Sequence, residues 1–152
     1  LKEIHRVLEV GGMLMFATLG PDTLNELRAA LPPSNAEHLH RFIDMHDLGD
    51  ALVGAGFSDP VMDMEMLTVT YTSLDDLFRD LRTSGSANAA LSRPRGLVGK
   101  AHWAGVRANY EQLRRNGRLP ATVEVVYGHA WKAAPKVMDD GRAIVRFERK
   151  AG

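Results

Sequence analysis

The apolar run MLMFATL, residues 13–19, constrains the fold of this chain more than any other segment. It follows an amphipathic helical pattern in residues 1–10 and the pair Gly11-Gly12, which is expected to end that helix. An apolar run without alternation is typical of a strand in a parallel-type sheet that is covered on both faces. We therefore expect a helix, a glycine turn and a strand buried on both faces, which is half of an α/β unit.

The rest of the chain predicts further helices and two long strands. In the first long strand, the alternation of Met62, Met64 and Met66 shifts by one position at Leu67, which predicts a bulge or a change in the covered face. The three methionines are expected to pack against a helix. The expected helices cover residues 22–31, 47–54, 74–82 and 103–113, and the expected long strands cover residues 61–72 and 122–133.

Capping residues are expected at three of these helices, and Asp47 can cap the helix at 47–54. Asp22 or Thr23 can cap the helix at 22–31, since both side chains accept hydrogen bonds from free N–H groups of a first turn. Ser73 is expected to cap the helix at 74–82. The first residue, Leu1, already belongs to a helical pattern with no Met and no cap before it, so we expect a piece of a longer protein.

Charge is distributed unevenly, although the net charge is zero. Residues 1–80 carry five Lys or Arg against fourteen Asp or Glu, whereas residues 81–118 carry eight against one. The basic segment either meets an anionic partner or folds onto the acidic face of the protein itself. Nucleic acid is not expected, because one segment alone is basic and no aromatic residues alternate with its bases.

Composition and hydropathy suggest a cytoplasmic protein. The sequence has no cysteine, which excludes disulfides and thiolate metal sites. No apolar run approaches the length of a membrane helix, and no signal-peptide pattern is present.

The phrase RVLEVGGMLMFATLG, residues 6–20, resembles the helix, glycine turn and fifth strand of class I S-adenosylmethionine-dependent methyltransferases. Three longer phrases narrow this likeness. They are FIDMHDLGDALVGAGFSDPVMD (42–63), GSANAALSRPRGLVGK (85–100) and LPATVEVVYGHAWKA (119–133). Together they resemble the malonyl-acyl-carrier-protein methyltransferases of biotin synthesis.

The resemblance implies a fold, an arrangement of domains and a cofactor. The fold is α/β with strand order 3-2-1-4-5-7-6, of which this chain would supply strands 5-7-6 and a helical insertion between strands 6 and 7. Residues 1–133 would form the C-terminal half of the domain, with a substrate lid at 73–118, and residues 134–152 a tail with an expected edge strand. S-adenosylmethionine would bind the full-length protein but not this chain, which contains no G-x-G-x-x-G loop.

Malonyl-acyl carrier protein or malonyl-CoA is the substrate that the resemblance implies. We expect Arg93, Arg95 and Lys100 to bind its anionic groups, with Arg93 or Arg95 on the malonyl carboxylate, because a guanidinium can hold both carboxylate oxygens. Thr18 and Gly20, at the carboxyl end of a strand, would form the rim of the site. The alternative for the three basic residues is a solvated basic loop or a helix end, and the alternative for Gly20 is a plain turn. No general base is expected, since the carboxylate is already ionised.

Arg107, Arg114 and Arg118 fall on a similar face of the helix and turn that follow, away from the Trp103 stripe. We expect them to dock an acidic carrier protein. Two other functions stay open: a methyltransferase relative that modifies an arginine in respiratory complex assembly, and a carrier-binding module without enzymatic activity. An unpaired edge on the strand at 13–19 would favour a homodimer or a domain swap.

Three histidines and an acid, His38, His40, His46 and Asp44, stand close together in the sequence. We do not expect a metal site, because their spacing brings no fourth ligand together and methyl transfer from a sulfonium needs no metal. His40 and Asp44 are instead expected to hold the loop in which they lie.

Overall fold

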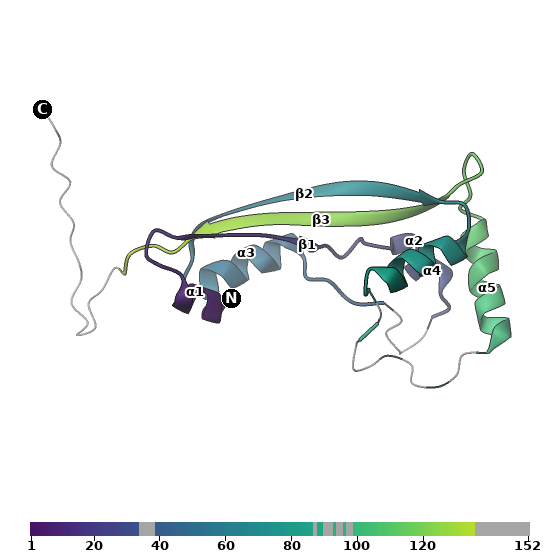
Figure 1. Ribbon diagram of the computed structural model, residues 1–152, viewed down its shortest axis with the longest axis horizontal. Helices are drawn as coiled ribbons and strands as arrows, with labels where there is room; N and C mark the ends of the chain where they lie inside the picture. Colours follow the sequence, from purple (N-terminus) through teal and green to yellow (C-terminus); the bar gives the residue numbers. More distant parts are fainter. Residues whose placement is uncertain (34–38, 87, 90–92, 94–95, 97–98, 136–152) are drawn as a thin grey trace, which may run out of the picture. The chain divides into compact units, whose positions relative to one another are not determined.

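The computed structural model describes residues 1–33, 39–86, 88–89, 93, 96 and 99–135. These residues form five α-helices and three β-strands (Figure 1). In chain order they are α1 (Lys2–Val7), β1 (Met13–Leu19), α2 (Asn25–Ala30), α3 (Met45–Gly54), β2 (Ser58–Tyr71), α4 (Leu74–Thr83), α5 (Lys100–Glu111) and β3 (Leu119–Trp131).

The three strands form one sheet in the order β1-β3-β2. Strand β3 runs antiparallel to β1, because Gly11 N–H donates to Lys132 O at 2.8 Å and Gly20 N–H donates to Glu124 O at 3.0 Å. Helices α4 and α5 form the insertion between β2 and β3. The predicted α/β class and the predicted order 5-7-6 are therefore confirmed.

Strand β1 departs from the prediction that it is buried on both faces. Its side chains alternate, with Leu14 and Phe16 half-buried and Met13 and Met15 exposed. Met15 is 68% exposed, because no described part of the chain packs on that face. Among the described strands β1 pairs with β3 alone, so its other edge is open, as the sequence predicted.

The described residues divide into two compact units, each with its own apolar core. The first unit comprises residues 1–16, 46–62 and 128–135. Its core is formed by Leu52, Phe57 and Ala130, against which Leu8, Leu14, Phe16, Ala55 and Met62 pack. Gly128 belongs to this core because a Cβ there would collide with the ring of Phe16.

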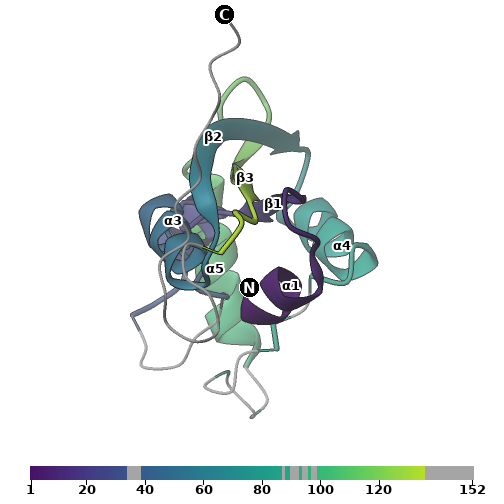
Figure 2. The same cartoon turned by 90° about the vertical axis from the view of Figure 1, so that its left-hand side faces the viewer.

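The second unit comprises residues 17–45 and 63–127. Helices α4 and α5 belong to this unit (Figures 1 and 2), and residues of both are in its core. Tyr110 of α5 is 1% exposed, and its hydroxyl donates to Pro120 O at 2.6 Å, which satisfies its polar end in the core. The core residues are Leu27, Ala30, Leu74, Leu77, Val106, Tyr110, Leu119 and Ala121.

The covered face changes in β3 and, as predicted, in β2. In β3 the buried positions shift from Leu119 and Ala121 to Glu124 and Val126. In β2 the covered positions shift from Met62, which packs on the first core, to Tyr71, which packs on the second. Met64 and Met66 are 40% and 45% exposed, so the prediction that they pack against a helix is wrong. The reason is that both faces of β2 are exposed from residue 63 to residue 70.

Candidate functional site

The second unit contains a cavity of about 1040 Å³ between its helices and the sheet. Its walls are largely apolar, and its polar lining residues include His40, Asp75, Arg82, Arg93 and Arg107. The apolar lining residues include Leu19 at the end of β1, Leu24 and Leu27 of α2, Leu77, Phe78 and Leu81 of α4, and Trp103 of α5. An apolar pocket with a few charged groups is the usual form of a site for a small organic ligand.

Two of the three predicted anion-binding residues are described, and only one of these two lines the cavity. Arg93 lines the cavity. Arg95 lies outside the described residues, so its predicted contact stays a prediction. Lys100 is the first residue of α5 and is exposed, and the cavity lining does not include it. Arg82, near the end of α4, also lines the cavity. Sequence analysis missed Arg82, because its position in a helical pattern shows nothing of a cavity.

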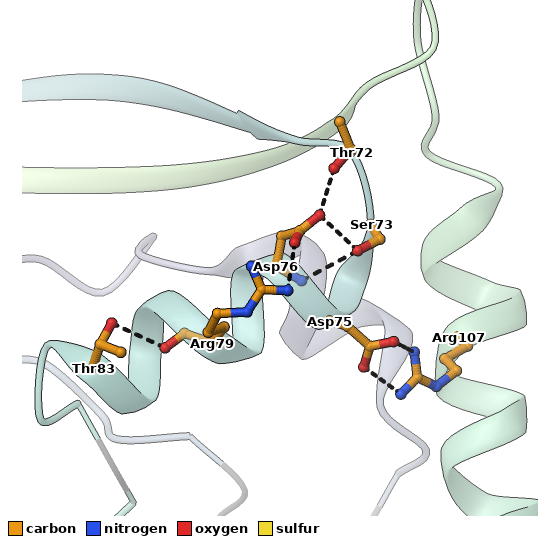
Figure 3. Close-up of polar contacts among 7 residues, drawn as sticks. All are labelled: Thr72, Ser73, Asp75, Asp76, Arg79, Thr83 and Arg107. Carbon is orange, nitrogen blue, oxygen red and sulfur yellow. Dashed lines mark hydrogen bonds and ion pairs between the residues drawn. The ribbon is translucent and has the colours of Figure 1, made fainter.

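Arg107 is bound to an acid of its own protein (Figure 3). Its Nη1 donates to Asp75 Oδ2 at 2.8 Å and its Nη2 to Asp75 Oδ1 at 2.6 Å, which joins α5 to α4 beside the cavity. The bidentate hydrogen bond lowers the pKa of Asp75. Arg107 was expected to dock a carrier protein, and in the structure its two terminal nitrogens already bind the Asp75 carboxylate.

Arg114 and Arg118 also make contacts within the chain. Arg114 pairs with the carboxylate of Glu111 and donates to Gly117 O at 2.7 Å and to Thr72 O at 3.2 Å. Arg118 donates to Thr70 O at 2.7 Å. These bonds tie the end of α5 to the end of β2. Of the three arginines, Arg107 alone contacts an acid outside the basic segment, and carrier docking stays a prediction.

The start of α4, which forms one wall of the cavity, is fixed by a network of hydrogen bonds (Figure 3). Ser73 caps the helix as predicted, because its hydroxyl oxygen accepts from Asp76 N–H at 3.2 Å. The Asp76 carboxylate accepts from the hydroxyls of Thr72 and Ser73 and pairs with Arg79 at 2.8 Å. The hydrogen bonds from Thr72 and Ser73 lower the pKa of Asp76 to about 2.

The predicted rim lies at the carboxyl end of β1. Thr18 is half-buried and Gly20 is buried. A Cβ on Gly20 would collide with the carboxylate of Glu124, so a side chain here would displace that carboxylate. Neither Thr18 nor Gly20 is among the lining residues of the cavity, whereas Leu19 and Thr23 are.

Glu124 is the second residue that sequence analysis missed. It is 4% exposed, and its Oε2 accepts from Asp22 N–H at 2.7 Å. The Thr23 hydroxyl donates to Glu124 O at 3.2 Å and accepts from Glu124 N–H at 3.1 Å. The predicted capping by Asp22 or Thr23 is therefore wrong: α2 begins at Asn25 after Leu24, without a side-chain cap. A single acid within the apolar strand VEVV was the signal that could have identified Glu124.

His40 holds its loop, as expected. Its Nε2 accepts from Ala89 N–H at 3.0 Å, and its backbone carbonyl accepts from Arg28 Nη2 at 3.3 Å. His38 lies outside the described residues. In the described part of the chain, no group of three or more His, Asp or Glu side chains is arranged to hold a metal. No helix in that part is long and apolar enough to cross a membrane.

Comparison with known proteins supports the resemblance seen in the sequence. No family model matches the chain. A malonyl-[acyl-carrier protein] O-methyltransferase from Gallionella capsiferriformans is 58% identical over 97% of the chain, one from Laribacter hongkongensis is 54% identical over 99%, and one from Methylovorus is 53% identical over 98%. The chain is similar to malonyl-[acyl-carrier protein] O-methyltransferases.

The chain spans about half the length of the curated relatives that it matches: 51%, 52% and 51% of the three, respectively. A solved structure of a protein from Bacillus halodurans, described as a methyltransferase, aligns with 88% of this chain and 56% of its own length. With 17% identity and a TM-score of 0.46, it is too distant to carry an argument about the fold.

Proposed function

We propose that this chain is the substrate-binding half of a methyltransferase that methylates the free carboxylate of a malonyl thioester on acyl carrier protein, in cytoplasmic biotin synthesis. The observation that carries the proposal is the apolar cavity with Arg93 in its lining. It occurs in a chain that is 58% identical to a protein named for this reaction.

The chemistry of the reaction requires positioning more than proton transfer. A carboxylate is ionised at neutral pH and can attack a methyl group directly, provided that it is held in line with that group. A guanidinium holds a carboxylate through two parallel hydrogen bonds. The apolar walls exclude the water that would otherwise solvate the nucleophile. Arg93 is the proposed anchor, and Arg82 lines the same cavity and adds a second positive charge.

The residues of this chain do not fit S-adenosylmethionine. They include no G-x-G-x-x-G loop to hold such a cofactor. We therefore infer that the methyl donor binds the part of the full-length protein that this chain does not span. Titration of this chain with S-adenosylmethionine should show no binding at micromolar concentrations, and the chain alone should be inactive.

Carrier docking is a separate part of the proposal. An acidic carrier protein would compete for arginines that now contact acids and carbonyls of this chain, namely Arg107, Arg114 and Arg118. Exposed ion pairs exchange readily, so such a competition is physically accessible. Affinity for the carrier should fall as salt is raised.

Methyl transfer by the full-length protein tests the proposal. Malonyl and acetyl thioesters of the same carrier differ by one free carboxylate, so they form a matched pair. We expect mass spectrometry to detect one added methyl group on the malonyl thioester and none on the acetyl thioester. Methylation of a protein arginine, or carrier binding without turnover, would refute the proposal in favour of one of the two other functions.

A further inference from the structure

We propose that His40 is a positioning residue for the substrate cavity, acting through the backbone of residues 88–89. The inference rests on the proposed function, since it concerns the same cavity. Its basis is a contact between segments far apart in sequence: His40 Nε2 accepts a hydrogen bond from Ala89 N–H at 3.0 Å.

His40 is connected to two sides of the cavity. His40 lines the cavity, and so do Arg93 and Asn88, the residue before Ala89. Its backbone carbonyl accepts from Arg28 of α2 at 3.3 Å, which anchors the residue independently of its side chain. The imidazole thus has a second anchor through its own backbone, and its Nε2 holds Ala89, the neighbour of the lining residue Asn88.

The contact requires one protonation state of the ring. Nε2 accepts a hydrogen bond only when it carries no proton, so the proton of the neutral imidazole lies on Nδ1. The charged groups around the cavity are Arg28 from α2, Asp75 and Arg82 from α4, Arg107 from α5, and Arg93. Asp75, the one carboxylate in the described lining, is bound by Arg107 and not by His40.

Substitutions at position 40 can separate positioning from bulk packing. Glutamine places its Oε1 near the position of Nε2, whereas asparagine places its Oδ1 near the position of Nδ1. We expect H40A and H40N in the full-length protein to raise the KM for the malonyl substrate about 5–10-fold, the effect of one lost hydrogen bond, with kcat changed less than about twofold. H40Q should restore the KM, because its Oε1 can accept the hydrogen bond from Ala89 N–H in place of Nε2. H129Q, on β3, is the matched control.

Amide exchange at Ala89 provides a readout that does not depend on activity. Exchange of this amide should be several-fold faster in H40A and H40N than in the wild type, and should return to the wild-type rate in H40Q. If the wild type does not methylate the malonyl thioester, the proposed function fails and Ala89 exchange still decides the role of His40. Unchanged exchange at Ala89 in H40A, or an unchanged KM in an active enzyme, would overturn the inference.

Discussion

Glu124 of β3 accepts a hydrogen bond from the backbone N–H of Asp22 at 2.7 Å, across 102 positions of sequence. The same carboxylate lies where a side chain on Gly20 would be, so the turn after β1 and the middle of β3 are fitted to each other. This turn leads into Thr23 and Leu24, which line the cavity. The buried acid thus shapes the rim at the carboxyl end of β1.

The fit predicts that substitutions at positions 20 and 124 are coupled. G20A should lower the free energy of unfolding by about 1–3 kcal/mol, because its Cβ meets the carboxylate. E124A should lower it by about 1–3 kcal/mol, because Asp22 N–H loses its partner, and E124Q should lower it less. In G20A/E124A the clash is gone. The double variant should therefore lose less free energy of unfolding than G20A and E124A lose in sum. Urea unfolding measures the stability of all four variants. Strict additivity of G20A and E124A would contradict the close approach of the two residues.

Asp76 predicts a pH dependence of stability. Its pKa is about 2 in the folded protein against an ordinary value of 3.8, so its ionised form stabilises the fold above pH 3.8. This contribution is lost as the pH falls from 3.8 through 2. D76N should therefore be less stable than the wild type at about pH 6, and the difference should shrink between about pH 4 and 2. D50N, on the exposed surface of α3, is the control. An equal difference at every pH would show that the charge of Asp76 is not responsible.

The pair Asp75–Arg107 predicts competition with the carrier protein. Both side chains are largely exposed, at 59% and 47%, so the pair contributes little to stability and weakens further with salt. If Arg107 docks the carrier, D75N should strengthen carrier binding by releasing Arg107, and R107Q should weaken it. Calorimetric titration at low salt measures both. Equal affinity in D75N, R107Q and the wild type would exclude Arg107 from docking.

Local signals in the sequence predicted the parts of the fold that depend on near neighbours. The apolar run at 13–19 and the two long alternating segments identified the three strands, and Ser73 identified the start of α4 because its partner, Asp76, is three residues away. The sheet order followed from the family resemblance and not from any local pattern.

Contacts between distant residues account for most of what the sequence did not predict. Asp22 and Thr23 have the chemistry of caps, but Glu124 holds the backbone N–H of Asp22 and the hydroxyl of Thr23, and α2 starts later than predicted. Arg107 and Asp75 are 32 residues apart, and nothing in either segment indicates their pairing. The exposed face of β1 could not be foreseen, because an apolar run does not show whether a second layer of the same chain covers it.

The central claim is that Arg93 in the cavity holds the malonyl carboxylate. It is tested most directly by the kcat/KM of the full-length protein for the malonyl thioester, compared between the wild type, R93Q and the control R115Q, whose arginine donates to Gln112 O outside the cavity lining. We predict a loss of about 10–100-fold in R93Q, the effect of removing hydrogen bonds to a charged group, and a change of less than about twofold in R115Q. A wild-type enzyme active on the malonyl thioester whose R93Q variant loses less than about threefold would contradict the account.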